Sequence, residues 1–188
     1  FEVELAGREA AVAKVFAARP LRFDVDPEFD LFRRLQPGEV PPSLSGVLGA
    51  EKCYAVLPAA APDRVIAAYR KIARALASGR GKEVEILGDD DPRLAGGPPP
   101  EATLWVLGRE NRLARLVAPA LAQYEEGAPR LPEEGATLVL ALPHPERRGA
   151  AWGFIHLEDP AAAAPLSRKL AHYGKYGYLV FLGEKARN

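Results

Sequence analysis

The stretch CYAVLPAAAPDRVIAAYRKIARALASG, residues 53–79, decides the fold class of this chain. It begins with the short apolar run CYAVLP, which is typical of a buried strand. The residues that follow repeat apolar side chains at helical intervals and end at Gly79, an ordinary helix stop. The residues on that helical face are Val65, Ile66, Tyr69, Ile72 and Leu76. A buried strand followed directly by an amphipathic helix is the start of an α/β unit.

Two further strand patterns continue this alternation. They are EVEIL, residues 83–87, and ATLWVLG, residues 102–108. The second is followed by RENRLARLVAPALAQY, a helical pattern for which Asn111 is the expected cap and Pro119 the expected kink. Strands that alternate with helices of this length indicate βαβ units and a largely parallel sheet.

The last third of the chain predicts a reversal of strand direction. TLVLALP and AWGFIHL are separated only by HPERRGA, and a parallel crossover needs about a dozen residues or more, so we expect an antiparallel hairpin. EDPAAAAPLSRKLAHYG then predicts a helix from Asp159 to Gly174. YGYLVFLG returns as the final strand, parallel to AWGFIHL. The sequence thus predicts a three-layer α/β domain with a mostly parallel or mixed sheet, helices on both faces and a C-terminal βαβ unit.

The N-terminal region follows a different pattern. Residues 1–27 alternate apolar and polar side chains, which predicts the terminal strands of an upstream Ig-like β-sandwich or an added sheet edge. Residues 28–50 form a proline-rich connector with one short amphipathic helical turn, Phe29–Leu35, and we expect it to be pinned to a surface. The α/β domain is expected at 51–183 and a tail at 184–188.

Composition excludes several classes of protein. Lys and Arg together number 25, as do Asp and Glu, so no overall charge attracts nucleic acid or an anionic membrane. No apolar run approaches the roughly 20 residues of a membrane span. The single Cys53 can form neither an internal disulfide nor a thiolate zinc site, and we interpret it as a buried core residue. The chain starts at Phe1 and has no methionine, which indicates a processed product or an excised fragment.

Polar side chains gather where two of the C-terminal strands begin. HPERRGA precedes one strand of the predicted parallel pair and HYGKYG precedes the other, so both belong to one rim. The rim consists of His144, Glu146, Arg147, Arg148, His172, Tyr173, Lys175 and Tyr176. In open α/β sheets, ligands bind outside the carboxyl ends of the strands. The rim meets the carboxyl ends of the early strands only if the final strands run antiparallel to them, and the sequence leaves both directions open.

Two interpretations of this rim compete. In the functional one, His144 or His172 is a general base beside Glu146, and Arg147 or Lys175 holds an anion near Tyr173 and Tyr176. In the structural one, the tyrosines bury their rings, the lysine lies beside a helix end, and the histidine helps to end the helix. The structural interpretation is favoured, since the chain has no serine nucleophile elbow.

Other candidate sites are weaker. GREN, with Gly108 and Asn111, ends a strand and opens a helix, so its amides are anion-binding candidates, but it lacks the glycines of a dinucleotide or P-loop motif. Asp89–Asp91 are interpreted as a solvated turn, because they lack the spacing of a calcium loop. His144, His156 and His172 are too scattered to predict a zinc site. We expect no metal and no cofactor.

Two stretches carry a family resemblance. FDVDPEFDLFRRLQPGEVPPSLSGVLGA resembles the segment that follows the Ig-like β-domain in bacterial secreted zinc aminopeptidases of the membrane-alanyl-aminopeptidase type and in related envelope proteins. LSRKLAHYGKYGYLVFLG resembles the end of a C-terminal module in such proteins, although YGYL departs from the YSYL of the pattern. LPHPERR and VLGRENRL extend the likeness weakly through the middle of the chain.

This resemblance implies a noncatalytic accessory domain. Such peptidases carry their zinc ligands and glutamate in an upstream catalytic domain, and no such motif occurs in this chain, so no catalytic residue is transferred to it. The implied location is secreted or periplasmic. The implied partners are upstream domains of the same polypeptide and components of the cell envelope, with no nucleic acid. The alternative is a small hydrolase or an anion-binding α/β domain that uses the His/Arg/Tyr rim.

Overall fold

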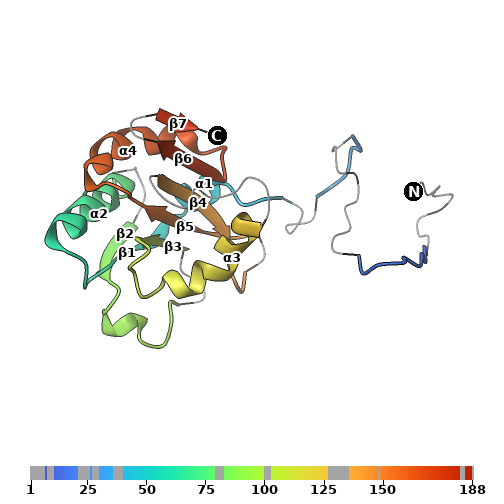
Figure 1. Ribbon diagram of the computed structural model, residues 1–188, viewed down its shortest axis with the longest axis horizontal. Helices are drawn as coiled ribbons and strands as arrows, with labels where there is room; N and C mark the ends of the chain where they lie inside the picture. The colour runs from blue at the N-terminus through green and yellow to red at the C-terminus, as the bar shows by residue number, and fades with distance from the viewer. Residues whose placement is uncertain are drawn as a thin grey trace. The chain divides into compact units, whose positions relative to one another are not determined.

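The chain divides into two compact units, residues 1–34 and 35–188. The computed structural model describes the following residues: 7, 11–20, 26, 30–35, 40–78, 83–99, 103–126, 136–147, 149–182 and 185–187. The second unit is an α/β domain built on one mixed sheet (Figure 1).

The sheet of the second unit has seven strands in the order β2-β1-β3-β5-β4-β6-β7. Their bounds are β1 Lys52–Leu57, β2 Glu83–Gly88, β3 Thr103–Leu107, β4 Thr137–Pro143, β5 Ala151–His156, β6 Tyr178–Leu182 and β7 Lys185–Arg187. β2, β1, β3 and β5 are parallel, β4 runs antiparallel to both β5 and β6, and β7 runs antiparallel to β6. The α/β class and the mixed sheet predicted from the sequence are confirmed.

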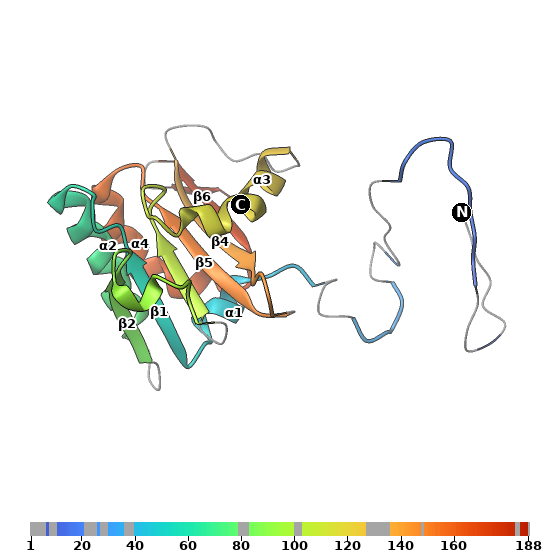
Figure 2. The same ribbon diagram turned by 90° about the horizontal axis from the view of Figure 1, so that it is seen from below.

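Helices cover both faces of the sheet, as Figures 1 and 2 show. Their bounds are α1 Leu44–Leu48, α2 Asp63–Leu76, α3 Ala114–Glu126 and α4 Ala163–Lys169, with 3₁₀ turns η1 Pro92–Leu94, η2 Pro160–Ala162 and η3 Leu170–Tyr173. α1, α2 and α4 contribute to one hydrophobic core, and η1 and α3 contribute to the other. The sheet therefore lies between two apolar layers.

The strands alternate their side chains between these two cores. In β3, Trp105 and Leu107 enter the core beneath α1, α2 and α4, whereas Leu104 and Val106 enter the core beneath α3. All five residues of β3 are buried. Because neither face of this strand is exposed to solvent, its sequence is a nearly continuous apolar run rather than an alternation of apolar and polar residues.

The C-terminal strands differ in one respect from the predicted βαβ unit. The expected hairpin forms, with Leu140 opposite Phe154 in the antiparallel pair of β4 and β5. β6 runs in the same direction as β5, as expected, but β4 lies between them. The segment η2-α4-η3 thus carries the chain across β4. The segment predicted as a tail includes β7, whose Ala186 is opposite Phe181.

The first unit tests the N-terminal predictions only in part. Residues 11–20 contain no strand, and the rest of the expected Ig-like strands falls on 1–6 and 21–25, outside the described residues. Residues 30–35 contain no helical turn, and the short helix of the connector is α1 instead. Asp26, with a positive φ of 55°, accepts backbone hydrogen bonds from Asp30 and Leu31.

Candidate functional site

The structure settles which edge of the sheet carries the predicted rim. β5 pairs parallel with β3, with Gly153 opposite Trp105, and β6 runs in the same direction as β5. The turn before β5 and the loop before β6 therefore lie at the amino edge of these strands. The carboxyl ends of β1, β2 and β3, which carry the turns after Leu57, Gly88 and Leu107, lie at the opposite edge. The two groups of candidate residues do not form one site.

His144 organises the hairpin turn between β4 and β5. Its side chain is buried, and its Nδ1 accepts hydrogen bonds from the amides of Glu146 at 3.1 Å and Arg147 at 3.0 Å. An Nδ1 that accepts two N–H groups places the hydrogen of the neutral ring on Nε2. The ring also packs edge-on against Trp152, with centroids 5.0 Å apart. His144 therefore stabilises the local backbone, and Glu146 is exposed beside it.

The other half of the rim is packed under aromatic rings. Tyr173 contacts Phe181 edge-on, at a centroid distance of 5.9 Å, and lies 6.0 Å from the ring of Tyr176. The Nζ of Lys175 lies 5.0 Å from the centroid of Tyr176, in cation–π geometry. His172 is exposed at the end of η3. Arg148, also predicted for the rim, lies outside the described residues.

The loop before β6 also binds the connector. The amide of Leu44 donates to the carbonyl of Tyr176 at 2.8 Å, and the amide of Ser45 donates to the carbonyl of Gly174 at 2.7 Å. A Cβ at Gly177 would overlap the carbonyl oxygen of Pro42. Residues 42–45 thus lie against this loop at backbone distance, and both amides belong to the start of α1, where no helical partner exists for them. We call residues 174–177 the connector seat.

Asp89 is the central polar residue of the carboxyl edge. It is 7% exposed, and its carboxylate accepts the amide of Ala59 at 2.9 Å and the amide of Arg112 at 2.7 Å. It thereby ties the end of β2 to the turns that follow β1 and β3. The prediction of a solvated turn is wrong for Asp89, because these two long-range hydrogen bonds compensate its burial. Asp91, by contrast, caps η1 and pairs with the exposed Arg93.

Asn111 and Gly108 shape the turn between β3 and α3. The buried Asn111 amide donates to the carbonyls of Val56 at 2.8 Å and Leu107 at 3.1 Å, and its Oδ1 accepts the amide of Leu113. Gly108 has a φ of +93°, which favours glycine. The amides of Gly108 and Asn111, the two anion-binding candidates, donate to the carbonyls of Ile155 and Gly108 within the protein. The Asp89 carboxylate occupies the Arg112 amide.

His156 and Tyr69 complete the carboxyl edge. Burial lowers the pKa of His156, and the nearby Arg109 lowers it further, against the opposing effects of Glu110 and Glu158. The Tyr69 hydroxyl accepts the amide of Leu157 at 3.1 Å, and burial raises its pKa well above the ordinary value. The sequence placed Tyr69 on the apolar face of a helix and His156 at the end of an apolar strand, but these patterns did not predict their polar contacts at this edge.

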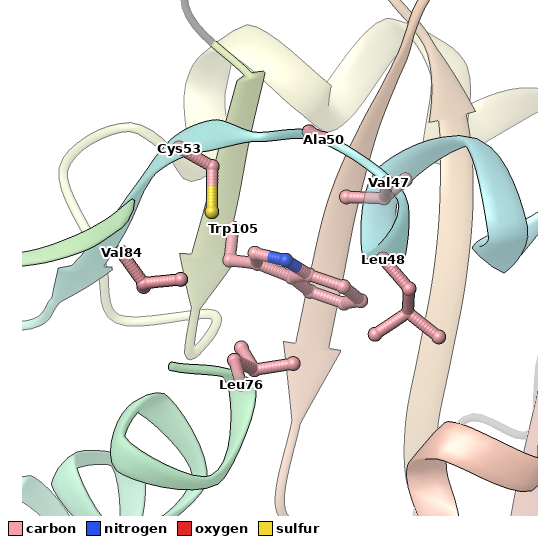
Figure 3. A pocket seen from close by; sticks show the side chains of 7 residues that line it. All are labelled: Val47, Leu48, Ala50, Cys53, Leu76, Val84 and Trp105. Carbon is pink, nitrogen blue, oxygen red and sulfur yellow. The ribbon is translucent and has the colours of Figure 1, made fainter. Parts of the chain in front are cut away.

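A cavity of about 10 Å³ lies at the amino edge, under α1 (Figure 3). Its lining residues are Val47, Leu48, Ala50, Cys53, Leu76, Val84 and Trp105. Small-molecule sites have volumes of about 300–1,000 Å³, so this space is a packing defect rather than a ligand site. The buried Cys53 thiol lines it, as expected of a core cysteine.

Within the described part of the chain, no three His, Cys, Asp or Glu side chains are grouped closely enough to hold a metal ion. No helix there has the length and apolar character needed to cross a membrane. No protein-family model and no curated protein matches the chain.

Proposed function

We propose that this chain is a noncatalytic accessory domain of a larger secreted or periplasmic protein, whose catalytic part is a zinc metallopeptidase. The observation that carries this proposal is the connector seat. The predicted reactive rim holds the chain segment that enters the domain, through the hydrogen bonds of Leu44 with Tyr176 and of Ser45 with Gly174. A seat of this kind anchors residues 42–45, through which the chain enters the α/β domain.

The state of the polar residues supports this role. The His144 ring orders a turn, and the Asp89 and Asn111 side chains bind backbone groups. General acid–base catalysis needs a group that can reach a substrate proton. The interactions at both edges instead hold strand ends and turns in place.

The resemblance to secreted aminopeptidases also supports the proposal. One of its two stretches contains Leu44 and Ser45, and the other contains Gly174 and Tyr176. These stretches are far apart in sequence, but they are hydrogen-bonded to each other in the fold. The two stretches that resemble an accessory module are therefore the stretches that contact each other at the connector seat.

Activity and zinc measurements on the purified chain test the proposal. We expect no hydrolysis of aminopeptidase, peptide or simple ester substrates, and no stoichiometric zinc after dialysis. His144→Ala and His172→Ala are prepared in parallel, since they remove the two candidate bases of the alternative hydrolase. Reproducible hydrolysis that either substitution abolishes, while the variant keeps its circular dichroism spectrum, would overturn the proposal.

A further inference from the structure

The outer surface of the α2/α4 layer carries an unbalanced positive charge. Six basic side chains are exposed on these two helices: Arg64, Arg70, Lys71, Arg74, Arg168 and Lys169. We call them the basic face. The only carboxylate on either helix is Asp63, at the first residue of α2. Among the described residues, no ion pair engages any of the six.

The helical spacing directs these side chains away from the core. Ile72, Ala73 and Leu76 lie on the buried side of α2, whereas Lys71 and Arg74 lie on the opposite side. Leu166 and Leu170 likewise bury one side of α4 and η3 and leave Arg168 and Lys169 in solvent. Because α2 and α4 cover the same face of the sheet and lie side by side (Figure 1), their cations form one surface.

Three exposed carboxylates lie at the start of this layer, because Asp63 begins α2 and Glu158 and Asp159 precede η2. Other acidic side chains belong to other elements. Glu83 and Glu85 are on the edge strand β2, Asp90 follows that strand, and Glu110 is in the turn after β3. The chain as a whole has no net charge, so the composition hides a segregated charge distribution. Such a distribution gives a local positive potential even when the total charge is zero.

We propose that the basic face adsorbs to an anionic phospholipid surface. Exposed residues beside these cations include the small Ala67, Ser78 and Ala171, which leave the charges open to a flat surface. Stable protein interfaces are centred on buried aromatic and apolar anchors, which the exposed positions of these helices lack. Binding to single-stranded nucleic acid uses stacked aromatic rings, which are likewise missing there. Charge alone is sufficient for adsorption to anionic lipid.

Vesicle binding by the full chain tests this inference, which does not depend on the proposed function. We expect co-sedimentation with vesicles made of equal parts phosphatidylglycerol and phosphatidylcholine, and none with phosphatidylcholine alone. Raising the ionic strength from about 0.1 M to 1 M shortens the screening length from about 10 Å to 3 Å, and should release the protein.

A pair of charge-matched variants locates the surface. Each Lys or Arg near an anionic surface strengthens adsorption about fivefold, so Lys71→Glu with Arg74→Glu should weaken partitioning by roughly 30-fold or more. Arg112→Glu with Arg115→Glu makes the same change of total charge on the α3 side and should retain binding. Both variants are checked by circular dichroism and thermal melting before use.

Three results would overturn the inference. The first is no binding to anionic vesicles at low salt. The second is an equal loss of binding in both charge-matched variants, which would show that total charge rather than the basic face is responsible. The third is binding to duplex DNA that is tighter than binding to vesicles and equally sensitive to Lys71→Glu with Arg74→Glu, which would assign the face to nucleic acid.

Discussion

The indole ring of Trp105 lies against the backbone of Gly153, its register partner across β3 and β5. A Cβ at Gly153 would overlap the ring carbons of Trp105. This contact packs the parallel strand β3 against β5 of the C-terminal hairpin. The bulky Trp105 ring fits there only because its partner, Gly153, has no side chain.

Gly153→Ala is therefore expected to destabilise the domain by about 1–3 kcal/mol, the usual cost of overpacking a core. Chemical denaturation measures this cost. In a Trp105→Phe background the smaller ring should reduce it, which a double-mutant cycle detects. Gly96→Ala is the matched control, because a Cβ there meets nothing within 4 Å. An equal cost at both glycines would contradict the packing described here.

Tyr69→Phe should lower the free energy of unfolding by about 1–3 kcal/mol, because it leaves the buried amide of Leu157 without its acceptor. The raised pKa of Tyr69 also predicts that the stability of the domain depends on pH. Its pKa is raised in the folded state, so its contribution is complete below the ordinary tyrosine pKa of about 10 and declines as the pH rises above it. Melting temperatures between about pH 8 and 11 should fall less steeply in Tyr69→Phe. An unchanged alkaline slope would contradict this assignment.

His156→Gln should weaken the acid dependence of stability. The pKa of His156 is lowered in the folded state, mainly by burial. Its contribution to stability is therefore complete above the unfolded pKa of about 6.5 and declines as the pH falls below it, since the unfolded chain binds the proton more readily. Denaturation midpoints between about pH 7.5 and 5 measure this slope. The assignment fails if His156→Gln and the parent chain lose stability equally steeply over this pH range.

Asp89→Asn should cost about 1–3 kcal/mol, because an amide NH₂ replaces one of the two oxygens that accept backbone N–H groups. Asp90→Asn, a change of equal charge at the exposed neighbour, should stay within about 0.5 kcal/mol of the parent chain. Urea denaturation distinguishes the two. Equal effects would show that the carboxyl edge is held together by something other than Asp89.

Local sequence patterns predicted the elements of the α/β domain well, but not their long-range contacts. The βα start at residues 53–79 and the hairpin around HPERRGA follow from spacing alone, because each is decided by neighbouring residues. The position of β4 between β5 and β6 depends on tertiary packing, so the pattern could not show it. α1 was missed because its two buried residues, Leu44 and Val47, follow a proline-rich segment that resembles a linker.

The polar residues were harder to assign for the same reason. DDDP resembles a solvated turn, yet the partners of Asp89 lie 30 and 23 residues away. The turn with His144 and the loop after His172 lie at the amino edge of β5 and β6 because these strands run in one direction. What the sequence could not show is that the loop after His172 receives the connector, because that contact joins distant parts of the chain.

The central claim is that the connector seat is structural, and amide hydrogen exchange at Leu44 and Ser45 tests it most directly. In the parent chain and in Gly96→Ala, both amides should be protected to a degree comparable with the buried strand β3. In Gly177→Ala, where the added Cβ would overlap the carbonyl of Pro42, both should lose protection while Val106 keeps it. Rapid exchange of Leu44 and Ser45 in the parent chain, or protection unchanged by Gly177→Ala, would contradict the claim.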